Sequence, residues 1–203
     1  MTELTNEDHQ AFEKEWWGNC CWTFGEENKQ ITYANRMGLE IMPNDHEKWP
    51  LYNLEGKSVL DIGGGPVSML LKTVNGRDLA VVDPCEYPGW VWQRYEENAI
   101  ECFVEPAEEF YTGYEYDEVW IYNVLQHVES PIDVMGTAIY NCKDGGVIRI
   151  FEWIDTAPCL GHPHTITAEW LDEIFGQRGT VEQMNGENNL YGKAYHGAFT
   201  VNK

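Results

Sequence analysis

The sequence has little positive charge. It holds 13 lysine and arginine residues against 34 aspartate and glutamate residues, so its formal net charge at pH 7 is −21. Because a field of that sign repels phosphate backbones and anionic headgroups, we expect no nucleic acid and no membrane as a partner. A neutral or cationic small molecule suits this charge better, although solubility or adaptation to salt explains the acidity equally well.

Long hydrophobic runs are also missing. No apolar run approaches the ~18 residues that a membrane-spanning helix needs. The first ten residues, MTELTNEDHQ, are acidic and polar, unlike a secretory signal or an Arg-rich transit peptide. We therefore expect a cytoplasmic protein, whose oligomeric state the sequence leaves open.

The cysteines lack the spacing of a metal site. None forms a C-x-x-C pair, so no zinc site is predicted. In a chain without a secretion signal, reduced thiols are the simplest state. The six cysteines are Cys20, Cys21, Cys85, Cys102, Cys142 and Cys159.

The chain divides into two parts of different pattern. At 203 residues it is long enough for one domain with a substantial core. Apolar residues at helical spacing predict helices over 8–17 and 27–40, and a polar stretch, MPNDHEKWP, follows them. We expect an N-terminal helical extension or lid over residues 1–52 and a core over residues 53–203.

Short apolar runs alternate with longer segments in the core. This alternation predicts a parallel sheet covered by helices on both faces. Toward the C-terminus, a helix over 167–175 precedes two strand-like runs, which predict an antiparallel hairpin at the sheet edge. The predicted strands are 59–62, 79–82, 100–104, 119–124, 147–151, 180–184 and 194–201, and the other predicted helices are 67–74, 90–98, 107–111 and 132–140.

Three consecutive glycines follow the first predicted strand, in the segment SVLDIGGGP. Glycine tolerates positive φ and lets the backbone approach a ligand closely. A helix starting near Val67 is expected to aim free N–H groups at that ligand. In an α/β sheet, ligands bind at the carboxyl ends of the strands, where Gly63, Gly64 and Gly65 are expected to lie.

The ligand at this turn is not expected to be a dinucleotide. The G-x-G-x-x-G pattern fails, because Ser68 stands at its third glycine position. Asp61 precedes the turn, and its carboxylate disfavours a pyrophosphate but favours the ammonium group of an amino acid. Asp83 comes 22 residues after Asp61, at the end of the next strand, where a carboxylate accepts ribose hydroxyl protons; a simple turn-forming role is the alternative.

The chain resembles the class I (Rossmann-like) S-adenosylmethionine-dependent methyltransferase superfamily over roughly residues 57–175. Five pieces carry the resemblance in order: VLDIGGGP, AVVDP, FVEPAEEF, YDEVWIYNVLQHVESP and NCKDGGVIRIFEW. It implies an α/β fold with a central, mostly parallel, seven-stranded sheet that is flanked by helices and has an antiparallel C-terminal edge strand. It also implies S-adenosylmethionine as the cofactor, bound by Asp61, Gly63, Gly64, Gly65, Asp83, Pro84, Ala107, Glu108 and Asn123.

Two departures from the family pattern affect this cofactor site. Val67 stands where the family's first motif has its third glycine, and Pro106 stands where many members have an Asp that contacts adenine. By resemblance, the backbone of Ala107 and the carboxylate of Glu108 take over the adenine contacts. A solvated position at the start of a helix is the alternative for Glu108.

His127 is the candidate catalytic residue. The segment 123–128 borders the methyl group in enzymes that this chain resembles, so Asn123 and Gln126 are expected to orient the cofactor or the acceptor. His127 titrates in the range of a general base. Because a similar histidine occurs in members with unlike substrates, we favour a positioning role for it over proton removal.

The acceptor site is expected to include residues from three segments. By resemblance, the connection after the fifth strand lines the acceptor pocket, and the N-terminal extension is a lid that closes over the cofactor. The aromatic side chains of the extension are suited to hold a cation, and ordinary packing on the core is the alternative for them. No metal is expected, because the histidines of GHPH have no Cys or carboxylate partner at ligand spacing. The candidate acceptor-binding residues are Trp17, Gln126, His127, Glu152, His162 and His164.

The leading function is methyl transfer from S-adenosylmethionine to oxygen or nitrogen of a small-molecule acceptor, which yields S-adenosylhomocysteine. One alternative is a non-catalytic protein that binds the cofactor, since D-x-G-x-G and Asp83 predict binding rather than turnover. Another is an NAD-dependent or nucleotide-sugar oxidoreductase, which Asp61 and the missing glycine disfavour. Transfer to nucleic acid is disfavoured by the negative charge.

Overall fold

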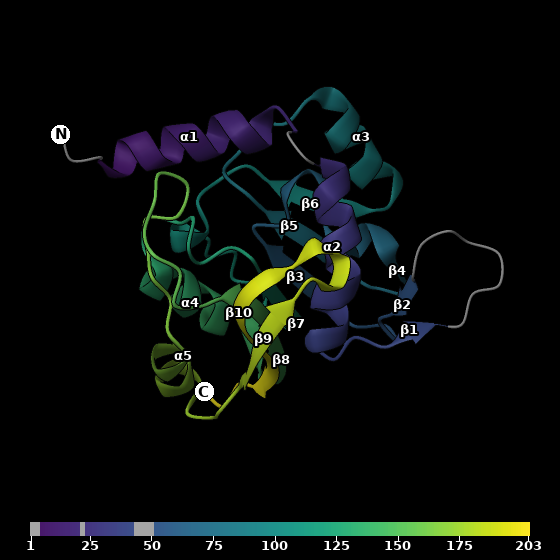
Figure 1. Ribbon diagram of the computed structural model, residues 1–203. Coiled ribbons are helices and arrows are strands. Elements are labelled where there is room, and N and C mark those ends of the chain that lie inside the picture. Colours follow the sequence, from purple (N-terminus) through teal and green to yellow (C-terminus); the bar gives the residue numbers. More distant parts are fainter. Residues whose placement is uncertain (1–4, 21–22, 43–50) are drawn as a thin grey trace.

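The computed structural model describes residues 5–20, 23–42 and 51–203 (Figure 1). Its main sheet has seven strands in the order β6-β5-β3-β7-β8-β10-β9. The first five run parallel, which confirms the predicted α/β class. The strands are β3 (Val59–Ile62), β5 (Leu79–Val82), β6 (Ile100–Phe103), β7 (Tyr116–Tyr122), β8 (Cys142–Trp153), β9 (Thr180–Asn185) and β10 (Tyr191–Thr200).

The C-terminal hairpin extends the sheet beyond β8. β10 is antiparallel to both of its neighbours, β8 and β9, as expected for the last strand. It lies one place inside the edge rather than at it, because β9 pairs along its outer side. The sheet thus has its antiparallel strand between two others that run in the common direction.

Helices cover both faces of the sheet. α2 (Thr23–Arg36) and α3 (Gly89–Glu97) pack on one face, and α4 (Pro131–Asn141) and α5 (Ala168–Phe175) pack on the other (Figure 1). Each face therefore has its own apolar core. α1 (Asn6–Gly18) lies across the end of the sheet, where Gln10 Nε2 donates to the carbonyl of His127, 2.9 Å away, just beyond β7.

The helix predicted over 67–74 is wrong. Two short 3-10 helices, Gly65–Val67 and Met69–Lys72, stand there instead, followed by β4 (Thr73–Val74). The amide of Ser68 donates to the Tyr95 hydroxyl at 3.0 Å, and that of Met69 donates to the Tyr122 hydroxyl at 3.1 Å. Because these two amides donate to tyrosine side chains, the chain does not continue here as an α-helix. The two amides are also not free to bind a ligand.

A small sheet joins the N-terminal segment to the core. β2 (Leu51–Asn53) pairs with β1 (Ile41–Met42) on one side and with β4 on the other. This sheet crosses the boundary expected at residue 52, so the N-terminal segment and the core share hydrogen bonds. The connector stretch at 43–50 lies outside the described residues. Of the helices described, none has the length and hydropathy to span a membrane.

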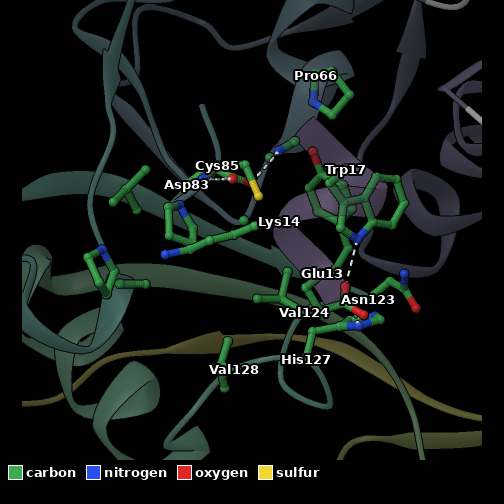
Figure 2. A pocket seen from close by; sticks show the side chains of 18 of the residues that line it. Glu13, Lys14, Trp17, Pro66, Asp83, Cys85, Asn123, Val124, His127 and Val128 are labelled. Carbon is green, nitrogen blue, oxygen red and sulfur yellow. Dashed lines mark hydrogen bonds and ion pairs between the residues drawn. The ribbon is translucent and has the colours of Figure 1, made fainter. Parts of the chain in front are cut away.

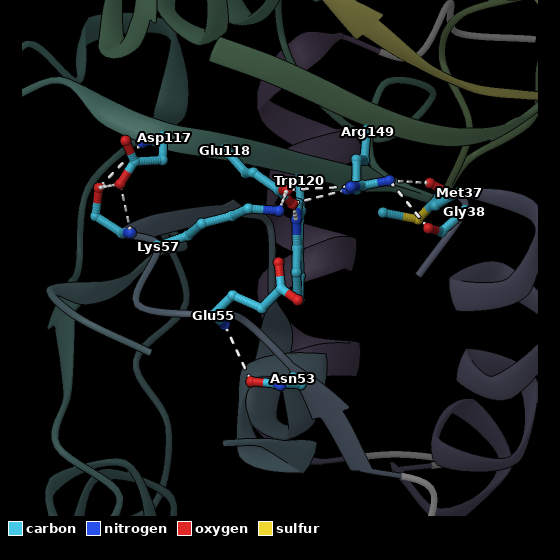
Figure 3. Close-up of polar contacts among 10 residues, drawn as sticks. Met37, Gly38, Asn53, Glu55, Lys57, Asp117, Glu118, Trp120 and Arg149 are labelled. Carbon is cyan, nitrogen blue, oxygen red and sulfur yellow. Dashed lines mark hydrogen bonds and ion pairs between the residues drawn. The ribbon is translucent and has the colours of Figure 1, made fainter. Parts of the chain in front are cut away.

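A buried ion-pair cluster ties α2 to the sheet (Figure 3). Glu118 on β7 is 2% exposed and accepts from Arg149 Nε at 2.7 Å and from Lys57 Nζ at 2.9 Å. Arg149 also donates to the carbonyl oxygens of Met37 and Gly38, at 2.7 and 3.2 Å, just after α2. One guanidinium therefore neutralises a buried acid and satisfies the carbonyl groups that follow α2.

Candidate functional site

A cavity of about 340 Å³ opens at the carboxyl ends of β3, β5, β6 and β7, and is called the first cavity (Figure 2). Its volume lies in the range of small-molecule sites, ~300–1,000 Å³. Its place fits the rule that α/β sheets bind ligands beyond their carboxyl ends. Its lining includes eight of the nine expected cofactor-binding residues: Gly63, Gly64, Gly65, Asp83, Pro84, Ala107, Glu108 and Asn123.

The glycine turn forms one wall of the first cavity. Gly63 and Gly65 both have positive φ, +68° and +64°. A Cβ on Gly63 would lie 2.6 Å from Val124 Cγ2, whereas one on Gly65 would meet nothing within 4 Å. The turn thus needs glycine at 63 for packing as well as conformation, and at 65 it leaves open space for a ligand.

Asp61 lies behind the glycine turn rather than in the cavity lining. It is fully buried and accepts hydrogen bonds from Ser68 Oγ and the Tyr122 hydroxyl. A Cβ on Gly64 would approach Asp61 Oδ2 to 2.8 Å. Burial raises the pKa of Asp61 to about 7, and its Oδ1 is buried without a hydrogen-bond partner within the described chain. The Asp61 carboxyl therefore supports the glycine turn from below.

Asp83 lines the first cavity and also organises the chain around it. Its Oδ2 accepts from the amide of Gly65 at 3.1 Å, and its Oδ1 accepts from the amide of Cys85 at 2.9 Å and the Tyr87 hydroxyl at 2.8 Å. Burial raises its pKa. Since Oδ2 accepts one hydrogen bond, it has capacity for a further donor from a ligand.

Glu108 has a structural partner that the sequence does not reveal. Its Oε1 accepts from the amides of Glu129 and Ser130, at 2.9 and 3.2 Å, immediately before α4. The carboxylate thereby satisfies free amides at the start of that helix. Glu108 also lines the first cavity together with Pro84 and Ala107, so this role and a ligand contact are compatible.

A second cavity, of about 690 Å³, adjoins the first. Its walls come from α1, from the start of α2, from the turn after β7, from β8 and the loop after it, and from the segment before β10. Its large apolar and aromatic lining residues include Phe12, Trp16, Trp17, Trp153, Leu160 and His162. The residues that line both cavities form the boundary between them: Glu13, Trp17, Glu26, Asn123 and His127. The two spaces therefore meet at His127.

His127 is held at this boundary by contacts from three directions. Its Nδ1 lies 2.8 Å from the carbonyl oxygen of Gly161 and 3.1 Å from Glu13 Oε2. The ring of His162 meets it edge-on, with ring centroids 4.6 Å apart. Figure 2 shows Glu13, Trp17 and Asn123 gathered around the imidazole.

The two amides expected beside His127 are bonded to each other. Gln126 Nε2 donates to Asn123 Oδ1 at 2.9 Å, and Asn123 has a positive φ of +59° at the end of β7. Gln126 is buried and lines the second cavity, and its Oε1 has no partner among the described residues. The carbonyl oxygen of the Gln126 side chain is thus buried without a hydrogen-bond donor among the described residues.

The remaining expected acceptor residues lie in three different settings. Trp17 lines both cavities and His162 lines the second, but neither Glu152 nor His164 appears in either lining. Glu152 is fully buried under the turn after β7, where its Oε1 accepts from the amides of Val124 and Leu125, and burial raises its pKa to about 7. His164 Nε2 lies 3.0 Å from the carbonyl of Val128, where it ties the loop after β8 to that turn.

Two residues at the cavities were not singled out from the sequence. Glu13 is 7% exposed and accepts from Trp17 Nε1 at 2.8 Å; the spacing i, i+4 between them is the signal that one helix face carries both. Tyr33 also lines the first cavity, and its buried hydroxyl lies beside the side chain of Trp153. Only α2's packing brings Tyr33 there, so no sequence pattern marks it.

The first cavity has a strongly negative lining. Among its described lining residues, Lys14 is the one lysine, and no arginine is present. This balance favours a ligand with positive charge and disfavours a pyrophosphate. In the part of the chain that the structure describes, no cluster of three His, Cys, Asp or Glu residues is arranged for a metal ion. The acids are Glu7, Glu13, Glu26, Asp83, Glu108 and Glu129.

No family model and no curated protein sequence matches the chain. Solved structures do match it. An N-methyltransferase, NodS from Bradyrhizobium japonicum WM9, in complex with S-adenosylhomocysteine, aligns with a TM-score of 0.64 and 17% identity over 97% of this chain and 99% of its own. A 1,6-didemethyltoxoflavin-N1-methyltransferase from Burkholderia thailandensis aligns with a TM-score of 0.64 and 14% identity over 100% of this chain and 93% of its own.

The fold of this chain is therefore that of the class I, Rossmann-like S-adenosylmethionine-dependent methyltransferases. The same fold also serves another reaction. The [4+2]-cyclase SpnF aligns with a TM-score of 0.54 and 13% identity over 76% of this chain and 57% of its own. The reaction has to be argued from the site rather than from the fold.

Proposed function

We propose that this protein transfers a methyl group from S-adenosylmethionine to nitrogen or oxygen of a small-molecule acceptor and releases S-adenosylhomocysteine. The observation that carries the proposal is the first cavity: a glycine turn and a ribose-type acid, Asp83, within a lining that has six acids and one lysine. S-adenosylmethionine carries a sulfonium and an ammonium group but no phosphate, so it suits this lining. We further propose that the enzyme is cytoplasmic and uses neither nucleic acid nor a membrane.

The chain's own residues account for the parts of such a cofactor. Asp83 Oδ2 accepts a ribose hydroxyl, and Pro84, Ala107 and Glu108 flank the adenine ring at the ends of β5 and β6. The turn from Gly63 to Gly65, with Asn123 opposite, holds the amino acid part. Tyr33, which lines the same cavity, carries a hydroxyl donor suited to the cofactor's carboxylate.

Asp61 supports this site from behind. Its unpartnered Oδ1 lies under the glycine turn, so its negative charge stabilises the cofactor's ammonium group at short range without lining the cavity. Because its pKa in the empty protein is about 7, a bound cation also favours its ionised form.

The second cavity holds the acceptor. Trp17, Gln126, His127 and His162 line it, and it meets the first cavity at His127 and Asn123. Glu152 and His164 act on the acceptor site through the segment 123–128, which they hold in place. A bound sulfonium supplies an activated methyl group, so the protein mainly has to align the acceptor with it and exclude water.

Binding of the cofactor is tested by calorimetry on the purified protein. We expect S-adenosylmethionine and S-adenosylhomocysteine to bind at one site, and NAD not to compete. Asp83→Asn should weaken S-adenosylhomocysteine binding by roughly 1–3 kcal/mol, because it removes a charged hydrogen-bond acceptor. The matched variant Asp133→Asn, which changes an exposed acid on α4, should leave the affinity unaltered.

Heat of binding with NAD and none with S-adenosylhomocysteine would overturn the assignment in favour of an oxidoreductase. Binding without turnover across an acceptor screen of metabolite extracts, read out as S-adenosylhomocysteine release, would favour a non-catalytic member of the fold.

A further inference from the structure

The hydrogen position on His127 is determined by its neighbours. Nδ1 faces two oxygens, the carbonyl of Gly161 at 2.8 Å and the carboxylate of Glu13 at 3.1 Å. Neither a carbonyl nor an ionised carboxylate donates a hydrogen bond, so Nδ1 carries the hydrogen. The neutral ring then has its lone pair on Nε2, which lies 3.4 Å from the side-chain nitrogen of Gln126.

Glu13 is built into this position rather than exposed beside it. The residue is 7% exposed, and Trp17 Nε1 donates to the same Oε2 at 2.8 Å. Gln10, one turn earlier on α1, donates to the backbone carbonyl of His127 at 2.9 Å. α1 is therefore docked on His127 by two of its side chains, one of which brings a buried carboxylate to the imidazole.

Three titratable groups of the described chain surround His127, and only Glu13 places a carboxylate against its Nδ1. Glu13 from α1, Glu152 from β8 and His162 from the loop after β8 face the ring. Burial, and then the proximity of His127, lower the pKa of His162, which keeps it neutral near pH 7. Glu152 points its Oε1 at two backbone amides instead. Glu13 is the carboxylate that faces the ring directly, with its Oε2 3.1 Å from Nδ1.

The second cavity indicates what kind of acceptor lies next to this pair. Its aromatic walls include Trp16, Trp17 and Trp153, and two of its acids are Glu13 and Glu26. Lys29, which also lines it, is paired with Glu26. Indole faces attract a cation, and neighbouring carboxylates favour a cationic ligand and repel an anionic one. This lining therefore suits an acceptor that carries an ammonium group and an apolar, planar part.

We propose that Glu13 and His127 form a carboxylate–imidazole pair that removes a proton from an amine acceptor bound against the indole walls of the second cavity. The inference rests on the proposed methyl transfer. The N–H bond of the bound ammonium breaks and its proton goes to His127 Nε2. The freed lone pair bonds to the methyl carbon, and the electrons of the carbon–sulfur bond go to sulfur. Glu13 is a positioning residue that stabilises the charge on the ring.

The first test needs no acceptor. Nitrogen-15 NMR of the full protein, with the His127 signals assigned from a His127→Gln variant, reports which ring nitrogen is protonated. We expect Nδ1–H in the wild type, and in Glu13→Gln we expect the Nδ1 signal to change, because the carboxylate that faces this nitrogen is gone. Glu15→Gln, an exposed acid on the same helix, should behave like the wild type.

The second test uses the amine acceptors found in the turnover screen. Glu13→Gln should lower kcat on the order of 10–100-fold and change the dependence of kcat on pH. S-adenosylhomocysteine should still bind, which separates failure of this inference from failure of the proposed function. An Nε2–H tautomer in the wild type, an unchanged Nδ1 signal in Glu13→Gln, or turnover restricted to hydroxyl or acidic acceptors would each overturn the proposal.

Discussion

Two of the three glycines after β3, Gly63 and Gly65, are glycine for different reasons. At Gly63 the backbone has positive φ and the side-chain position is already filled by Val124. At Gly65 the backbone also has positive φ, but the side-chain position is open. Alanine substitution at these two positions therefore separates the effect on packing, at 63, from the effect on ligand binding, at 65.

We expect Gly63→Ala to lower the free energy of unfolding by roughly 2–5 kcal/mol, because left-handed strain and overpacking add. Gly65→Ala should cost about 1–2 kcal/mol from strain alone, and it should also weaken S-adenosylhomocysteine binding. Urea unfolding of the empty protein and calorimetry measure the two effects.

Gly145 is the matched control for strain. It has a φ of +76°, open space at its side-chain position and no place in the cavity linings. Gly145→Ala should lose the same stability as Gly65→Ala and bind the ligand normally. Equal binding by both variants would mean that the space at Gly65 is not used by the cofactor.

At the scale of elements, α2 depends on a residue far away in the sequence. Arg149 on β8 is paired with buried Glu118 and donates to the two carbonyl groups after α2 (Figure 3). α2 in turn carries Tyr33 into the first cavity wall. The position of a residue in the first cavity wall is thus linked to an ion pair within the sheet.

Arg149→Met should lower the free energy of unfolding by roughly 3–5 kcal/mol, because it leaves a buried carboxylate without its arginine. The double variant Glu118→Gln/Arg149→Met should lose less than the single one, since no uncompensated charge remains. Urea unfolding measures both. A loss below ~1 kcal/mol in Arg149→Met would indicate that Lys57 alone neutralises Glu118.

At the scale of the whole molecule, charge opposes stability at neutral pH and above. The formal net charge is −21, and the buried carboxyls Asp61 and Glu152 both have pKa values near 7. In the unfolded chain such carboxyls titrate near ~4, so the folded state binds their protons more tightly. Their stabilising contribution is present in acid and is lost as the pH rises through about 7.

Two histidines act in the opposite sense at lower pH. Burial lowers the pKa of both His162 and His196, so the unfolded state binds their protons more tightly, and their contribution to stability rises with pH up to roughly 6.5. This rise offsets part of the loss from the carboxyls at lower pH, and above roughly 6.5 only the carboxyls of this set continue to titrate.

We expect the free energy of unfolding to fall by on the order of 1 kcal/mol between about pH 6.5 and 8. Asp61→Asn should flatten this dependence, because one of the two carboxyls no longer titrates. Added sodium chloride at pH 8 should raise the thermal midpoint by screening the repulsion among acidic side chains. Calorimetric scans across pH and salt measure both effects, and a stability that rises between pH 6.5 and 8 would contradict the assignment.

Much of the fold follows from local sequence. β3 spans the predicted residues 59–62, and β5 spans the predicted residues 79–82. Short apolar runs that end at glycine or proline strongly favour a buried strand. α5 falls within the predicted helix 167–175, and Thr167 caps it by accepting from the amide of Trp170 at 3.2 Å. The placement of the glycine turn and Asp83 at one edge of the sheet follows from the same alternation.

The tertiary structure decided the features that depend on residues distant in the chain. Tyr95 and Tyr122 take the amides of Ser68 and Met69, so the helix predicted there does not form. Glu13 meets His127 across 114 positions only because α1 crosses the end of the sheet. Local patterns encode periodicity and turn geometry, whereas such hydrogen bonds exist only after packing has brought the side chains together.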